Sequence, residues 1–337
     1  MSRPIALITG ASGEVGHLLI PALAAKGFDV VALDLVAVAP AIADQCVESL
    51  EASVLDEEPI RDLFRRRPPE CVFHLAAVLS SKAERDPELA HRVNVQGTYG
   101  LLELARGQSM HRGSPVRFIF PSTIAVYGLP DAATKTAAGA VKESEWTVPQ
   151  GMYGCNKLYC ELLGSYLTAN AQGRPLDFRA VRYPGLISAE TLPSGGTTDY
   201  APQMLHAAAR GKPYGCFVGP DSRLPFMTMP DAVEALLRLA SVDASRLSTR
   251  VYNVRGFSAS AAEIREQVLT HFPQAQIDFS PVPEKQSLVD SWPEDVDDGL
   301  ARRDWGFRPR HGLAEALADY LVPALRSQYV EAAERGR

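Results

Sequence analysis

Short apolar runs alternate along the chain with longer segments in which apolar residues recur every three or four positions. An apolar run of roughly four to eight residues is typical of a strand buried on both faces, and the longer period is typical of an amphipathic helix. Strands are predicted at 4–9, 29–34, 46–50, 71–75, 117–120 and 177–182. Helices are predicted between them at 14–26, 57–67, 87–106 and 153–171.

This alternation predicts an α/β fold of the Rossmann type, a doubly wound parallel sheet with helices on both faces. We expect a first domain at 1–183 and a smaller, interleaved C-terminal lobe at 184–330 that partly returns to it. Residues 130–150 break the rhythm and are interpreted as a surface insertion. In the second lobe, helices are predicted at 199–210, 230–240, 261–271 and 313–326, with a short strand at 251–254.

Composition narrows the classes of partner. The chain has 337 residues, 46% of them hydrophobic, and a formal net charge of −6, so neither nucleic acid nor an anionic membrane is expected as a partner. No uncharged apolar run is long enough to span a bilayer. The five cysteines form no Cys-x-x-Cys pair, so we expect a reduced, cytoplasmic protein without a metal site.

The turn between the first strand and the first helix carries Gly10, Gly13 and Gly16. Glycine permits the tight turn and the close approach of a pyrophosphate to the backbone, and the helix N-terminus offers free N–H groups. Asp34 follows at the end of the second strand, where a carboxylate accepts the ribose hydroxyls of NAD and repels the 2′-phosphate of NADP. The pattern therefore predicts NAD as the cofactor. The alternatives are a plain glycine-rich turn and, for Asp34, a turn cap.

A second constellation is Tyr153 and Lys157, one helical turn apart on the same helix face. Tyrosine near its usual pKa of about 10 is a poor base, but an adjacent ammonium about 4 Å away would favour the phenolate by roughly 4 kcal/mol before desolvation is subtracted. The strand one β/α unit earlier ends near Ser122 and Thr123, at the sheet edge where ligands bind. These residues are predicted to form a proton-transfer site, whereas His74 is interpreted as a structural residue at a strand end.

The motifs together resemble the extended short-chain dehydrogenases/reductases, also called the NAD-dependent epimerase/dehydratase family. The resemblance rests on Thr9-Gly10-x-x-Gly13-x-x-Gly16, His74-Leu-Ala-Ala77, Asn94-Val-x-Gly97-Thr98, Ser122-Thr123-x-x-Val-Tyr-Gly128 and Tyr153-x-x-x-Lys157. It implies that Tyr153 is the general acid/base, Lys157 its partner, and Thr123 the hydroxyl that orients the reacting oxygen. The family often has Asp at the position of Ser53, so the adenine contact there is altered. The implied NAD contacts are Gly10, Ser12, Gly13, Glu14, Val15, Gly16, Asp34, Leu35, Ser53, Val54, Leu75, Ala76, Ala77, Asn94, Pro121, Tyr153, Lys157, Tyr183 and Leu186.

The C-terminal half is most similar to the short-chain type of L-threonine 3-dehydrogenase, through Arg182-Tyr-Pro-Gly-Leu-Ile-Ser188 and Pro193-Ser-Gly-Gly-Thr-Thr-Asp-Tyr-Ala201. The resemblance implies a compact pocket for a small amino or hydroxy acid, with the turn at 195–198 donating to a carboxylate. The implied substrate residues are Ser80, Thr123, Tyr153, Gly196, Thr197 and Trp292. The turn is alternatively an exposed loop, and Trp292 is alternatively ordinary packing between lobes. Two departures are Ser194, where these enzymes usually have Gly, and the long insertion.

We therefore predict an enzyme, an NAD-dependent oxidoreductase that oxidises the secondary alcohol of a small carboxylate substrate, with L-threonine to 2-amino-3-ketobutyrate as the first expectation. Three alternatives stay open at this point: a dehydrogenase of another small hydroxy acid such as the aldonate erythronate, a sugar epimerase of the same family, and an NAD-binding sensor or scaffold. The resemblance also implies a homodimer formed through the helices at 87–106 and 153–171.

Overall fold

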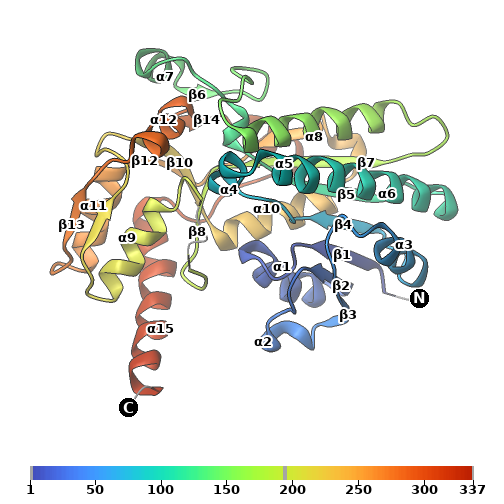
Figure 1. Ribbon diagram of the computed structural model, residues 1–337, viewed down its shortest axis with the longest axis horizontal. Helices are drawn as coiled ribbons and strands as arrows, with labels where there is room; N and C mark the ends of the chain where they lie inside the picture. The colour runs from blue at the N-terminus through green and yellow to red at the C-terminus, as the bar shows by residue number, and fades with distance from the viewer. Residues whose placement is uncertain (1–2, 193–195, 336–337) are drawn as a thin grey trace.

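The fold is built around a seven-stranded parallel sheet with the strand order β11-β7-β5-β4-β1-β2-β3. The computed structural model describes residues 3–192 and 196–335. Figure 1 shows this sheet with helices in front of and behind it, and the smaller lobe at its side. The strands are β1 (Ile5–Thr9), β2 (Asp29–Asp34), β3 (Cys46–Glu51), β4 (Cys71–His74), β5 (Arg117–Thr123), β7 (Asp177–Tyr183) and β11 (Val251–Asn253).

Helices cover both faces of the sheet, as the sequence predicts for a Rossmann fold. α1 (Glu14–Ala25) and α10 (Met229–Ser241) pack on one face. α3 (Glu57–Arg66), α6 (Thr98–Arg112) and α8 (Met152–Ala169) pack on the other. The strands bury both faces because successive residues alternate: Ile8 joins the core under α1 and α10, and Leu7 joins the opposite core.

The smaller lobe has its own sheet and core. Strand β10 (Arg223–Thr228) lies between β8 (Gly185–Ile187) and β12 (Phe257–Ser260), and β9 (Tyr214–Cys216) pairs with β13 (Ile277–Phe279). Around these strands lie α9 (Tyr200–Ala209), α11 (Ala261–His271), α12 (Pro283–Ser291) and α15 (Val322–Arg335). Because α10 and β11 belong to the large sheet, the chain passes between the lobes more than once.

The predicted boundaries shift where helices have irregular turns. The predicted helix at 87–106 is a continuous helical segment of α5 (Pro87–Ala90), a π-helical turn at His91–Gly97 and α6, so it ends at Arg112. The predicted helix at 313–326 similarly extends through α14 (Leu313–Glu315) and a π-helical turn to the end of α15. A π turn disturbs the regular apolar spacing on which the prediction depends.

Residues 130–150 lie largely at the surface, as predicted, but they carry secondary structure that the sequence did not indicate. This segment forms α7 (Ala132–Ala138) and β6 (Ala140–Val141), and β6 pairs with β14 (Asp295–Val296) of the smaller lobe. Lys135 and Val141 are buried. The segment therefore packs against the second lobe, and a mixed, weakly periodic sequence concealed this.

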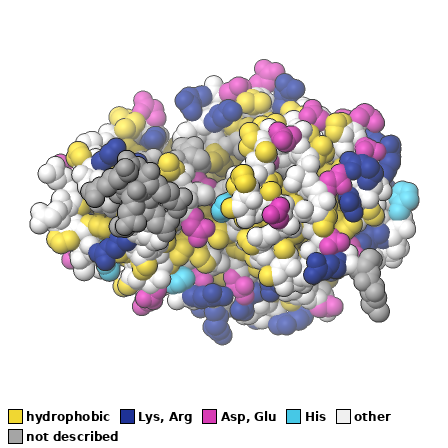
Figure 2. Space-filling model, turned by 90° about the horizontal axis from the view of Figure 1, so that it is seen from below, with side chains coloured by type: hydrophobic (Ala, Val, Ile, Leu, Met, Phe, Trp, Pro, Cys, Tyr) yellow, Lys and Arg dark blue, Asp and Glu magenta, His cyan; other side chains and the backbone are white. Residues whose placement is uncertain are grey.

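Within residues 3–192 and 196–335, no helix is long and apolar enough to cross a bilayer. On the face shown in Figure 2, acidic, basic and apolar side chains are interspersed.

Candidate active site

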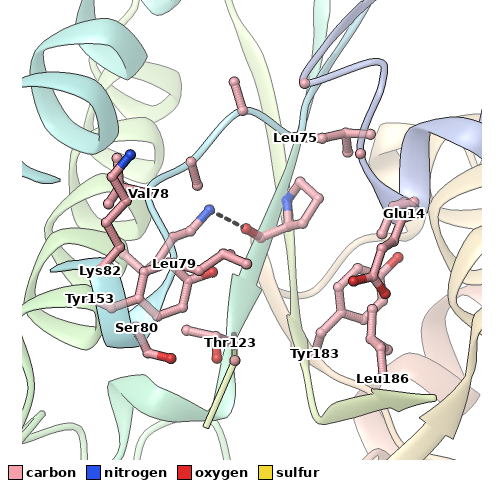
Figure 3. Close-up of a pocket in the computed structure, with 18 of the residues that line it drawn as sticks. Glu14, Leu75, Val78, Leu79, Ser80, Lys82, Thr123, Tyr153, Tyr183 and Leu186 are labelled. Carbon is pink, nitrogen blue, oxygen red and sulfur yellow. Dashed lines mark hydrogen bonds between the residues drawn. The ribbon is translucent and has the colours of Figure 1, made fainter. Parts of the chain in front are cut away.

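A cavity of about 600 Å³ lies between the two lobes, at the carboxyl ends of β1, β2, β4, β5 and β7. This is the edge at which open parallel sheets bind ligands. Most of the predicted site residues line it, and Figure 3 shows part of this lining. The predicted residues found there are Gly10, Gly13, Glu14, Val15, Gly16, Asp34, Leu35, Ser53, Val54, Leu75, Ala76, Ala77, Ser80, Pro121, Thr123, Tyr153, Lys157, Tyr183, Leu186, Gly196, Thr197 and Trp292.

The glycine turn has no room for side chains. Gly10 has a φ of +69°, and a Cβ atom there would lie 2.5 Å from the backbone nitrogen of Ala76. A Cβ atom on Gly16 would overlap the carbonyl oxygen of Ala11. Because Gly13 immediately precedes α1, the first turn of that helix opens onto the cavity. An open helix N-terminus beside a turn without side chains fits a pyrophosphate.

Asp34 ends β2 with its carboxylate held by two backbone amides. The amide of Ser12 donates to one oxygen (2.9 Å) and that of Val36 to the other (3.3 Å). Asp34 therefore caps a turn and lines the cavity at the same time. The described cations in the lining are Lys82 and Lys157, and neither is adjacent in sequence to Asp34. This environment fits a ribose with free hydroxyl groups better than one with a 2′-phosphate, so the residues present fit NAD.

Two predicted NAD contacts do not line the cavity. The Ser12 hydroxyl donates to the carbonyl oxygen of Val36 (3.0 Å), so this residue supports the turn that carries Asp34. Asn94 is buried and bonds both backbone groups of Val78: its Oδ1 accepts from the amide (2.7 Å), and its Nδ2 donates to the carbonyl (3.0 Å). Its role here is to fix the loop after β4, which lines the cavity.

Tyr153, Lys157 and Thr123 meet at one end of the cavity. Tyr153 and Lys157 project from the first turns of α8, and Thr123 ends β5 (Figure 3). Lys157 Nζ donates to the carbonyl oxygen of Pro121 (2.7 Å) and lies 5.7 Å from the centroid of the Tyr153 ring. The Thr123 hydroxyl accepts a hydrogen bond from the amide of Ala125 (3.1 Å). The three predicted catalytic side chains are thus brought together.

The electrostatic expectation for Tyr153 needs correction. Burial raises the pKa of Tyr153 above its usual range, because the charged phenolate loses its solvation. Burial also lowers the pKa of Lys157 from its usual 10.5 to about 8, and the nearby Cys160 and Glu161 offset only part of this effect. Desolvation therefore outweighs the attraction between Lys157 and a phenolate. The roughly 4 kcal/mol expected from the spacing of the two residues did not include this desolvation cost.

Ser80 and Thr197 are in direct contact, and Ser80 lies beside Tyr153 and Thr123 (Figure 3). Ser80 begins α4 (Ser80–Arg85), and its hydroxyl lies 3.0 Å from that of Thr197, which is 2% exposed. The amide of Thr197 donates to the same Ser80 hydroxyl (3.3 Å), and the amide of Gly196 donates to the Asp199 carboxylate (2.7 Å). These two amides thus bond within the protein, and donation from the turn at 195–198 to a substrate carboxylate stays a prediction.

Outcomes for the remaining substrate residues are mixed. Ser194 and residue 195 of the predicted turn lie outside the described residues. Trp292 lines the cavity and is 5% exposed, so it contacts the site and also packs between lobes.

Sequence reasoning missed several lining residues, among them Lys82, Pro184 and Met229. Lys82 projects from α4 beside Tyr153 (Figure 3) and belongs to a helix of six residues, too short to show a period. Met229 begins α10, which the prediction started one residue later.

His74 is structural, as predicted. Its Nδ1 lies 2.6 Å from the Thr9 hydroxyl and its Nε2 lies 2.8 Å from the Thr98 hydroxyl. Burial, together with the charge of Lys157, lowers the pKa of His74 to about 3, so the ring is neutral. Among the described residues, no group of three or more His, Cys, Asp or Glu side chains is placed to hold a metal ion.

Comparison with known proteins agrees with this geometry. Residues 6–254 match the model of the NAD dependent epimerase/dehydratase family. The chain is 33% identical over 316 residues, covering 94% of this chain and 81% of the relative, to the mitochondrial L-threonine 3-dehydrogenase of Bos taurus. It is also 33% identical over 328 residues, covering 96% of this chain and 98% of the relative, to an uncharacterized epimerase/dehydratase of Staphylococcus haemolyticus. A solved structure of a partial consensus L-threonine 3-dehydrogenase superposes with a TM-score of 0.86 at 35% identity, covering 96% of this chain and 100% of the other.

Proposed function

Because the chain belongs to the NAD-dependent epimerase/dehydratase family, we propose that it is a dehydrogenase of a small carboxylate substrate that converts L-threonine to 2-amino-3-ketobutyrate. The observation that carries the proposal is a cluster of hydroxyl groups at one end of the cavity. Tyr153, Thr123 and Ser80 lie close together there (Figure 3), and Thr197 contacts Ser80. Such a compartment suits a small polar molecule.

In the proposed reaction the C3 hydroxyl of the substrate lies between Tyr153 and Thr123. Thr123 Oγ1 orients the oxygen. Tyr153 accepts its proton at Oη in the phenolate form, which the positive charges of Lys157 and of bound NAD would favour against the effect of burial. Lys157, fixed on the carbonyl of Pro121, supplies a positive charge beside the phenol. NAD supplies, when bound, a positively charged ring that accepts the hydride from C3. The glycine turn and Asp34 would hold it.

A nucleotide sugar is a poorer candidate substrate. The segment after β7 is Pro184-Gly-Leu-Ile187, and Pro184, which lines the cavity, has neither an N–H group nor a polar side chain. The lobes therefore offer few donors for a diphosphate at this point. Erythronate and related hydroxy acids are the closer alternative, because Ser194 and the segment at 130–150 distinguish the chain from the enzymes that it resembles.

The test is an assay of NADH formation with purified protein, NAD and L-threonine, with erythronate and other small hydroxy acids in parallel. Turnover on threonine supports the proposal. Turnover on another acid alone keeps the mechanism and changes the substrate. Absence of NADH formation on every acid, with tightly held cofactor in the purified protein, contradicts the proposal and favours an epimerase.

The proposal includes a division of the chain into an NAD-binding domain at 1–183 and a substrate lobe at 184–330. The separate sheets support this division, although α10 and β11 return to the first domain.

A reducing compartment such as the cytoplasm is supported by five free cysteines. Labelling the native protein with a thiol reagent directly after lysis tests this, since oxidised Cys155 would contradict it.

We also propose a homodimer through α6 and α8. Tyr99 on α6 and Tyr159, Leu162 and Tyr166 on α8 are at least half exposed, and the two helices lie side by side (Figure 1). Large exposed apolar patches mark interaction surfaces. Light scattering should give twice the chain mass, and Leu162→Glu should give a single chain. Val282→Glu, at an exposed apolar position of the other lobe, should leave the mass unchanged.

A further inference from the structure

The segment at 129–141 contacts the chain on both sides of Trp292. Before the tryptophan, Lys135 Nζ donates to the carbonyl oxygen of Val289 (2.9 Å). The amide of Leu129 donates to the carbonyl oxygen of Ser291 (2.8 Å). After it, the Thr136 hydroxyl donates to the carboxylate of Glu294 (2.9 Å). Trp292 is therefore bracketed by three hydrogen bonds from one short segment.

Backbone pairing extends these contacts. β6 runs parallel to β14, with Ala140 opposite Asp295 and Val141 opposite Val296. The amide of Asp297 donates to the carbonyl oxygen of Val141 (2.8 Å). The chain that carries Trp292 is thus fixed at both of its ends by residues 129–141.

The same segment is tied to the catalytic residues through the chain. Thr123 lies six residues before Leu129, and Tyr153 lies in the first turn of α8, which follows β6 along the chain. Tyr127, four residues after Thr123, is buried and donates to the side chain of Asn253 (2.7 Å). Residues 129–141 consequently link the part of the chain that carries Thr123 and Tyr153 to the part that carries Trp292, and all three residues line one cavity.

Lys135 is an unusual choice for a residue that only stabilises the fold. Lys135 is 5% exposed. Burial lowers its pKa to about 8, and the negative charges of Asp290 and Glu294 offset only part of this shift. A buried ammonium costs free energy that a methionine of similar length would not. Its contact with the last carbonyl groups of α12, directly before Trp292, gives it a positional role instead.

We propose that residues 129–141 set the position of Trp292 and thereby the size of the substrate compartment, with Lys135 and Thr136 as positioning residues. This rests on the proposed function and deepens it. A compartment of fixed size admits the methyl group of threonine and excludes the longer alkyl group of 3-hydroxynorvaline. Loosening the contacts should relax that discrimination.

The first test measures Trp292 directly, without cofactor or substrate. The Trp292 fluorescence is obtained as the difference between each protein and its Trp292→Phe counterpart. In the double variant Lys135→Met/Thr136→Val, we expect the emission to move to longer wavelength and acrylamide quenching to increase. Lys142→Met makes the same Lys-to-Met change at an exposed lysine directly after β6. It should alter neither the emission wavelength nor the quenching of Trp292. Unchanged Trp292 emission and quenching in the double variant would overturn the proposal.

The second test uses turnover. The double variant should raise KM for threonine about fivefold, which corresponds to about 1 kcal/mol, with kcat little changed. Its ratio of kcat/KM for 3-hydroxynorvaline over threonine should increase. In a Trp292→Ala background the same double change should have no further effect on KM, and full additivity there would contradict the proposal.

The two tests separate this proposal from the proposed function. If the unmodified protein does not oxidise threonine, the proposed function fails, and the fluorescence result still decides the position of Trp292. If it oxidises threonine and the double variant behaves like Lys142→Met in both tests, only the positioning proposal fails.

Discussion

The two ends of the cavity are constructed differently. At the proposed cofactor end, the glycine turn and Asp34 lie within residues 10–34, a single β-α-β unit, although residues 53–54, 75–77, 183 and 186 also line it. The substrate end combines side chains from residues 80, 123, 153, 197 and 292, which come from both lobes. A local segment specifies the centre of the first end, whereas only the complete fold assembles the second. Mutations should therefore separate the two ends.

The largest effect is expected for Tyr153→Phe. Loss of the phenol oxygen removes the proton acceptor, so kcat should fall about 1,000-fold or more, within the range of general acid–base catalysis. NAD affinity should stay within about twofold, since the glycine turn and Asp34 are untouched. Steady-state rates and a fluorescence titration with NADH measure the two quantities. More than a tenth of the original activity would remove Tyr153 from the mechanism.

Lys157 lies where the two ends meet, and its replacement should affect rate and stability in opposite directions. Lys157→Met should reduce kcat about 100-fold yet raise the free energy of unfolding at pH 7. The folded pKa of about 8 lies below the usual 10.5. The unfolded state therefore binds more protons between those values, and stability rises with pH there.

Below pH 8 the full cost of burying the ammonium is present, on the order of 3 kcal/mol. Denaturant unfolding at pH 7 and 9, without cofactor, should show a smaller rise for Lys157→Met than for the unmodified protein. Lys135 shifts in the same direction and leaves a residual slope. An unchanged slope in Lys157→Met would show that its burial does not govern this pH dependence.

Asp34→Asn should change the cofactor end alone. The amide cannot accept from both ribose hydroxyls and the Ser12 amide as the carboxylate does, so KM for NAD should rise about tenfold. Discrimination against NADP should weaken, because the negative charge is lost. KM for threonine is the internal control. A comparable rise in that value would contradict the separation of the two ends.

Thr197→Val should give the smallest effect, confined to the substrate end. The change keeps the shape of the side chain but removes the hydroxyl that contacts Ser80 (3.0 Å). KM for threonine should rise about fivefold, as for one hydrogen bond, and KM for NAD should not change. Thr198→Val, at the adjacent lining position, is the matched control and should have a weaker effect on KM.

The sequence predicted what local rules determine. Except for the edge strand β3, the strands of the first domain are buried on both faces, and their apolar runs made them visible; Gly10, Gly16 and Asp34 lie where spacing placed them. What depends on the folded surroundings could not be predicted. The Thr197 amide bonds to Ser80, which is distant in sequence, and burial dominates the pKa of Tyr153. Neither partner choice nor desolvation is encoded in spacing.

The position of β11 at the edge of the large sheet has a consequence for synthesis on the ribosome. β7 ends at Tyr183 and its partner β11 begins at Val251, so 67 residues lie between them. At about 5–20 residues per second, β7 has an unpaired edge for roughly 3–14 s, and the apolar face of α1 lacks α10 for roughly 10–40 s. The nascent chain therefore exposes an aggregation-prone edge for several seconds, during which a chaperone can bind it.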